Sequence, residues 1–196
     1  MWEGKRKYIG GGEESFGFLP YDAVRDKCSP SAICLICEIA AYAKDNGMTL
    51  YDYLLKIYED YGFQRETTIN VVRPGKTGAE EIAQMMVNYR ANAPKEIAGE
   101  KVVKIKDFQL SVQKELVDGE WKESPIKMAL DAKSNVLQYF TDGGLKVSVR
   151  PSGTEPKIKF YFEVPAQMPT PDAAGYKAAT AAAEARVPAI KASLGI

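Results

Sequence analysis

A short polar segment near the C-terminal end, RPSGTEPK, carries side chains suited to binding a phosphate ester. Arg150 can hold two phosphate oxygens at once with its planar guanidinium group. Ser152 and Thr154 can each donate a hydroxyl hydrogen, and Lys157 adds a second positive charge. Gly153 has no side chain, so backbone N–H groups can close on the anion. The segment predicts a phosphate-binding loop, while an ordinary surface turn of the same residue types remains the alternative.

A glycine-rich run near the start of the chain, GGGEESFG, is a second candidate site. Three consecutive glycines allow backbone angles that bring the main chain close to a ligand. Glu13 and Ser15 lie two positions apart and face the same way if the loop is extended. A carboxylate accepts hydrogen bonds from sugar hydroxyls, and a serine hydroxyl can donate or accept them. The run predicts a sugar-binding loop, with a glycine-rich hairpin bearing solvated acids as the alternative.

Both segments resemble loops of the α-D-phosphohexomutases, the phosphoglucomutase and phosphomannomutase family. RPSGTEPK is similar to the phosphate-binding loop of the family's last domain, and GEESFG is similar to the sugar-binding loop of its third domain. The resemblance also implies that Lys27 reaches the active-site cleft, because the residues before the following helix commonly read R-x-K-D-G in the family. Here Cys28 stands in place of the aspartate, which leaves open what orients Lys27.

The resemblance implies an enzyme that interconverts hexose 1-phosphates and hexose 6-phosphates. The family works through a phosphoserine and a hexose 1,6-bisphosphate intermediate, with Mg²⁺ as cofactor, and the serine and metal loops belong to its first two domains. This sequence has no histidine, which the serine loop contains, and no aspartate run of the metal-loop type. We therefore expect a C-terminal fragment with no catalytic residue and no metal ligand of its own. Such a fragment would bind the phosphosugar substrate and would need the missing N-terminal domains for activity.

Two other classes of protein remain open. A stand-alone phosphosugar- or anion-binding module without catalysis would use the same two loops. A purely structural interaction domain would carry both loops by coincidence. Within the enzyme class, GEESFG suits several diols, so glucose, mannose, N-acetylglucosamine and a pentose all remain possible sugars.

The composition restricts the partners and the compartment. Twenty-six basic side chains balance twenty-six acidic ones, which argues against a nucleic-acid or anionic-membrane partner. The sequence contains no apolar run long enough to cross a bilayer and begins without the apolar stretch of a signal peptide, so a cytoplasmic location is predicted. Cys28, Cys34 and Cys37 lie close together, but no histidine or fourth cysteine completes a zinc site. We interpret them as structural thiols in an apolar segment.

Residues 1–62 are predicted to form the C-terminal part of the sugar-binding third domain, an incomplete α/β piece. The pattern predicts a strand at 5–9 and helices at 29–46 and 49–61, ended by glycines. One strand and two helices cannot complete a helix-covered parallel sheet. We therefore expect an exposed apolar face and association with the missing segment or with a second copy.

Residues 63–196 are predicted to form the phosphate-binding C-terminal domain, of α+β class. Period-two alternation predicts strands on both sides of RPSGTEPK, at 145–150 and 158–164, and further strands at 66–72, 101–105, 108–117 and 135–141. One helix is expected to begin at Thr77 with a capping box to Glu80, and a terminal helix at 172–194 is expected to bend or break at Pro188. The resemblance implies a four-stranded antiparallel sheet with two helices.

Overall fold

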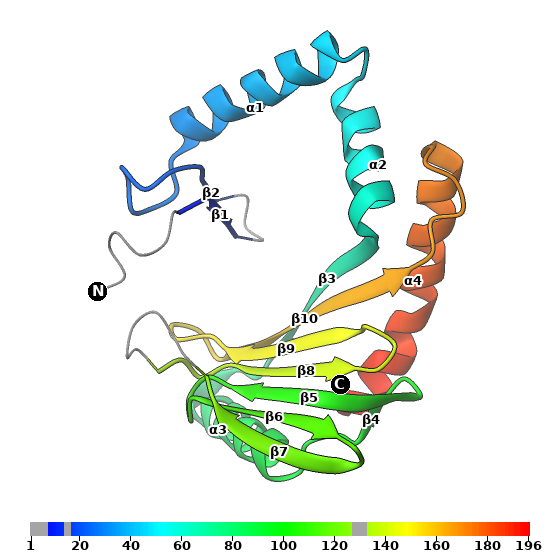
Figure 1. Cartoon of the computed structure of the whole chain (residues 1–196). Helices are drawn as coiled ribbons and strands as arrows, with labels where there is room; N and C mark the ends of the chain where they lie inside the picture. Colours follow the sequence, from blue (N-terminus) through cyan, green and yellow to red (C-terminus); the bar gives the residue numbers. More distant parts are fainter. Residues whose placement is uncertain (1–7, 14–16, 127–132) are drawn as a thin grey trace. The chain divides into compact units, whose positions relative to one another are not determined.

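The structure is a computed structural model that describes residues 8–13, 17–126 and 133–196 (Figure 1). The chain divides into two compact units, Met1–Asp60 and Tyr61–Ile196.

The first unit holds two helices and a small hairpin. Strand β1 (Gly11–Gly12) pairs antiparallel with β2 (Phe18–Leu19), and helices α1 (Ser29–Asp45) and α2 (Leu50–Tyr61) follow. Most of the strand predicted at 5–9 lies outside the described residues, and residues 8 and 9 are not in a strand. The helices are therefore the main elements of this unit.

Local signals set the ends of both helices. Pro30 lies in the first turn of α1, where a missing N–H costs nothing, and Gly47 adopts a positive φ of 71° just after the helix. Helix α2 begins with a capping box, because the Asp52 N–H donates to the Thr49 hydroxyl at 3.1 Å and the Thr49 N–H donates to the Asp52 carboxylate at 2.8 Å.

Few side chains of the first unit are buried. Among the described residues of α1 and α2, only Ala43 and Leu55 are. Several large apolar side chains of these helices are exposed: Ile33, Ile36, Tyr42, Leu50, Leu54 and Ile57.

The second unit is built on one antiparallel sheet of eight strands. The strand order is β3-β10-β9-β8-β5-β6-β7, and β4 pairs with β5 off this path. The strands are β3 (Phe63–Val72), β4 (Glu96–Ile97), β5 (Glu100–Asp107), β6 (Val112–Val117), β7 (Glu120–Pro125), β8 (Leu137–Thr141), β9 (Lys146–Pro151) and β10 (Lys157–Ala166). The predicted α+β class with an antiparallel sheet is confirmed, but the expected number of four strands is wrong.

Pairings at the two edges account for the larger sheet. Asp118 and Gly119 both have positive φ, 54° and 83°, which is the geometry of a two-residue hairpin turn. This turn pairs β7 with β6 over six residues. At the other edge β3 pairs with β10 over ten residues. Both pairings add strands that a four-stranded count leaves out.

Helices α3 (Gly75–Ala91) and α4 (Ala173–Leu194) cover one face of this sheet (Figure 1). The Tyr89 ring of α3 contacts the Phe160 ring of β10 edge-on at 5.9 Å, and the Tyr139 hydroxyl donates to the Tyr89 carbonyl at 3.0 Å. Each fully buried large side chain on this face adds about 1.5–3 kcal/mol of hydrophobic stabilisation. The fully buried residues of β9 and β10 are Val147, Val149, Ile158, Phe160, Phe162 and Val164.

Two predicted helix features differ from the structure. Helix α3 starts at Gly75 after Pro74, without a side-chain cap, so the Thr77–Glu80 capping box is wrong. Helix α4 continues through Pro188, so a break there is wrong as well. Its start is capped by Asp172, which accepts a hydrogen bond from the Gly175 N–H at 2.7 Å. No described helix has the length and apolar character needed to span a membrane.

Candidate functional site

The segment RPSGTEPK connects β9 to β10 and is closed at its base. The Ser152 N–H donates to the Lys157 carbonyl at 2.8 Å, and the Lys157 N–H donates to the Glu155 carbonyl at 2.7 Å. Inside the turn the Ser152 hydroxyl accepts long hydrogen bonds from the N–H groups of Thr154 (3.4 Å) and Glu155 (3.3 Å). The backbone therefore holds the two ends of the loop together while its tip stays exposed.

The loop is also tied to the neighbouring strand. The Arg73 N–H donates to the Pro156 carbonyl at 2.9 Å, and Lys157 is the register partner of Val72 at the end of β3. The ends of β3, β9 and β10 thus hold the base of the loop that carries the predicted phosphate-binding residues.

Arg150 lies at the end of β9, where the loop begins. Its side chain is exposed and makes no hydrogen bond or ion pair with any residue that the structure describes. Arg150 is also the register partner of Lys159 on β10. Lys157, by contrast, forms an ion pair with Glu155. This pairing with Lys157 lowers the pKa of the Glu155 carboxyl, with a smaller contribution from Lys159.

The space around Gly153 is open. A Cβ atom built on Gly153 would meet no heavy atom within 4 Å, and no positive φ is present. The fold of the loop therefore does not require glycine at this position. Its predicted role, close approach of the backbone to an anion, concerns the ligand-bound state.

In the first unit, Glu13 and Lys27 lie together. The Lys27 ammonium is 3.2 Å from a Glu13 carboxylate oxygen and 2.8 Å from an Asp26 carboxylate oxygen. These contacts, with Asp26 first and Glu13 second, raise the pKa of Lys27. Asp26 thus orients Lys27 although Cys28 has replaced the aspartate of the family pattern. Ser15 lies outside the described residues.

Gly17 makes the contact between Lys27 and Glu13 possible. A Cβ atom on Gly17 would lie 2.5 Å from the Lys27 Cγ and 3.3 Å from a Glu13 carboxylate oxygen. The main chain also ties the two sides of the loop, because the Glu13 N–H donates to the Gly17 carbonyl at 2.8 Å. A side chain at Gly17 would force the lysine stem away from the carboxylate.

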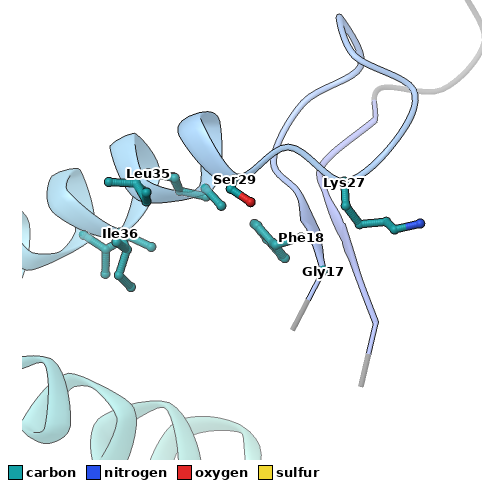
Figure 2. A pocket seen from close by; sticks show the side chains of 9 residues that line it. Gly17, Phe18, Lys27, Ser29, Leu35 and Ile36 are labelled. Carbon is teal, nitrogen blue, oxygen red and sulfur yellow. The ribbon is translucent and has the colours of Figure 1, made fainter. Parts of the chain in front are cut away.

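A mostly apolar hollow of about 720 Å³ lies beside this loop, at the start of α1 (Figure 2). Figure 2 shows the Phe18 ring directed toward the first turn of α1, while the Lys27 side chain points away from Leu35 and Ile36. The apolar lining does not suit a sugar phosphate. The polar groups of the loop, rather than this hollow, form the candidate sugar site.

Neither the cysteines nor the acidic residues form a metal centre in the described ranges. No group of three or more histidine, cysteine, aspartate or glutamate side chains is placed to hold an ion among residues 8–13, 17–126 and 133–196. All three cysteines are free thiols. Cys34 and Cys37 are exposed, so these two thiols are not buried in the packing of this unit.

Two charged residues near the loops were missed in the sequence. Asp26 was not predicted because the family pattern has its aspartate after the lysine, whereas Asp26 precedes Lys27. Lys159 was not predicted because it lies two residues beyond the segment RPSGTEPK. Period-two alternation could have found it, since Lys157 and Lys159 point to the same face of β10.

The fold agrees with comparisons to known proteins. The family model described as phosphoglucomutase/phosphomannomutase, C-terminal domain, matches residues 69–183. This range includes β9, the loop and β10. The chain therefore belongs to the phosphoglucomutase/phosphomannomutase C-terminal domain family.

Individual relatives are phosphoglucomutases. The chain is 35% identical over 153 residues to the phosphoglucomutase of Staphylococcus haemolyticus (strain JCSC1435), covering 78% of this chain and 27% of the relative. It is 38% identical over 153 residues to that of Staphylococcus aureus (strain MRSA252), covering 78% of this chain and 26% of the relative. The chain thus spans about a quarter of the length of these relatives.

A solved structure shares the fold. The chain is similar to the open form of pp63/parafusin, a phosphoglucomutase from Paramecium, with a TM-score of 0.53 and 16% identity. The match covers 96% of this chain and 31% of the parafusin chain. At this identity the likeness supports the fold alone.

Proposed function

We propose that this chain is the C-terminal part of a phosphohexomutase that interconverts hexose 1-phosphate and hexose 6-phosphate. In this proposal residues 1–62 belong to the sugar-binding third domain, and residues 63–196 form the phosphate-binding last domain. The enzyme acts in the cytoplasm. The observation that carries the proposal is the loop between β9 and β10 in a member of this family. It presents an exposed guanidinium, which has no hydrogen bond or ion pair to any described residue, beside an open glycine.

The loop holds the phosphate group that does not react. Arg150 donates two charge-assisted hydrogen bonds to phosphate oxygens, and the hydroxyls of Ser152 and Thr154 donate to the same group. Gly153 leaves room for the backbone to approach, and Lys157 contributes charge. Binding energy from this remote phosphate positions the opposite end of the sugar for reaction.

The loop of the first unit addresses the sugar hydroxyls. The Glu13 carboxylate accepts hydrogen bonds from them, and Ser15 donates or accepts. Lys27, oriented by Asp26 and Glu13, donates from its ammonium group. A carboxylate and an ammonium 3.2 Å apart offer an acceptor and a donor to adjacent hydroxyls.

The phosphoserine, the bisphosphate intermediate and the metal belong to other parts of the proposed enzyme. In the family Mg²⁺ stabilises the charge that develops on the transferred phosphoryl group. The described residues of this chain do not form a cluster that fits Mg²⁺. No catalytic step is assigned to them, and we propose that the chain alone is inactive.

Titration of the 196-residue chain with glucose 6-phosphate tests the proposal. We expect saturable amide shifts in an NMR spectrum at residues 150–157, and none with unphosphorylated glucose at the same concentrations. A chain with no saturable response at residues 150–157 would contradict the phosphate-anchor role. Mutase turnover by the chain alone would contradict the proposed division of labour.

A further inference from the structure

The loop between β9 and β10 contains its own anion. The Glu155 carboxylate contacts the Lys157 ammonium, the group that the proposed function assigns to the phosphate. The Lys157 side chain is largely covered, with 25% of its surface exposed, whereas 58% of the Glu155 side chain is exposed. The carboxylate of this pair is therefore the partner more accessible to solvent, and to an anion that comes from solvent.

A further cation lies next to this pair. Lys159 is two residues beyond Lys157 on β10, so the two side chains leave the same face of the strand. In the sheet register Lys159 stands opposite Arg150. The charge of Lys159 also contributes to the low pKa of the Glu155 carboxyl, which indicates that the two groups are within electrostatic reach.

We propose that Glu155 is an internal counter-ion that a phosphate group displaces when it binds to the loop. We further propose that Lys159 joins Arg150 and Lys157 in holding that phosphate group. Both statements rest on the proposed phosphate-binding function of the loop and extend it by two residues.

The exchange is physically favourable because the incoming group is the better ligand. A phosphate ester brings more charge and more acceptor oxygens than one carboxylate. The Thr154 and Glu155 N–H groups now make long bonds of 3.4 and 3.3 Å to the Ser152 hydroxyl, so turning toward a phosphate costs them little. An ion pair whose carboxylate is largely exposed to solvent is weak, so releasing Glu155 lowers the affinity for phosphate by only about two- to five-fold.

The chain contains a matched control for the effect of charge. Glu163 of β10 forms an ion pair with Lys146 of β9 at 2.6 Å. Lys146 lies four residues before Arg150 on β9, so both side chains leave the same face of the sheet. Glu163→Gln and Glu155→Gln each remove one negative charge from a lysine partner. Only Glu155→Gln frees a lysine of the loop.

The roles proposed for Glu155 and Lys159 are tested by the dissociation constants of the full chain for glucose 6-phosphate. These constants are measured by NMR titration or calorimetry. We expect Glu155→Gln to bind about two- to five-fold more tightly than the original chain, and Lys159→Gln to bind at least three-fold more weakly. Glu163→Gln should bind as the original chain does. Thermal unfolding of each variant shows whether the fold is retained.

The outcomes separate this inference from the proposed function. Unchanged or weaker binding by Glu155→Gln overturns the counter-ion role, because that result is expected if Glu155 only stabilises the loop through its ion pair with Lys157. Unchanged binding by Lys159→Gln overturns its place in the site. If Arg150→Ala binds as well as the original chain, or if no binding occurs at the loop, the proposed phosphate anchor fails and this inference fails with it.

Discussion

Replacing Arg150 with alanine separates the contribution of this residue to binding from its contribution to folding. Arg150 is exposed at the end of β9 and makes no hydrogen bond or ion pair with any described residue. Its backbone stays paired with Lys159 whatever the side chain. We therefore expect the free energy of unfolding to change by no more than about 0.5 kcal/mol, as for an exposed side chain without partners.

The expected loss in ligand binding is several times larger. Hydrogen bonds to a charged group contribute about 1.5–3 kcal/mol, and Arg150→Ala removes those made to the phosphate. This corresponds to a loss in affinity of about 10- to 150-fold. Arg150→Lys keeps the charge but loses the planar guanidinium group, so its affinity for the phosphate should lie between that of the original chain and that of Arg150→Ala.

The assay is the steady-state kinetics of the full-length enzyme that contains this chain, with glucose 1-phosphate as substrate. Because the spectator phosphate stays bound through the transition state, kcat/KM should fall by the same 10- to 150-fold. Arg65→Ala is the control, since Arg65 is bound to Glu184 at 3.0 Å near the opposite end of β3 and should leave kcat/KM unchanged. An unchanged kcat/KM for Arg150→Ala would refute the reasoning, and so would a fall that merely tracks a loss of stability.

Four further changes test other parts of the molecule. Gly153→Ala should leave the melting temperature unchanged, because its Cβ meets open space, yet weaken glucose 6-phosphate binding in a titration. Gly175→Ala should lower the melting temperature clearly, because its Cβ would overlap the Thr170 carbonyl oxygen; an unshifted melting curve would contradict this contact. Glu13→Gln should reduce kcat/KM of the full-length enzyme less than Arg150→Ala and leave phosphate affinity intact; a loss of phosphate affinity would contradict its assignment to sugar hydroxyls. The hydrogen bond from the Gly175 N–H lowers the pKa of Asp172, so the ionised carboxylate stabilises the fold above the unfolded pKa of about 4, and this stabilisation is lost as the pH falls through the folded pKa. Thermal unfolding between pH 6 and 3 should show this loss in the original chain and not in Asp172→Asn.

The strands around the loop were predictable because their signal is local. Apolar residues alternate with polar ones before and after RPSGTEPK, and the strands predicted at 145–150 and 158–164 match β9 and β10 within two residues at each end. A strand whose one face is buried must show this alternation whatever strand it pairs with. The helix ends at Thr49 and Gly47 were predictable for the same reason, since caps depend on residues within one turn.

The size of the sheet was decided only by the tertiary structure. The family resemblance implied four strands and the residue pattern predicted six, whereas the sheet has eight, because no single segment shows how many partners it will find. Strand β3 lies beside β10, almost a hundred residues later, and β5 pairs with both β6 and β8. Register pairing depends on which strand edges remain open after the others have paired.

Part of the chemistry of the candidate site can likewise be predicted from the sequence, and part depends on the tertiary structure. The residue types of the loop, and therefore its suitability for phosphate, can be read from RPSGTEPK alone. That Lys159 stands opposite Arg150 and that Asp26 orients Lys27 both depend on the folded structure. Sequence determines which charges are present, whereas Coulomb energy depends on the distance and solvent between them, and the folded chain alone sets both.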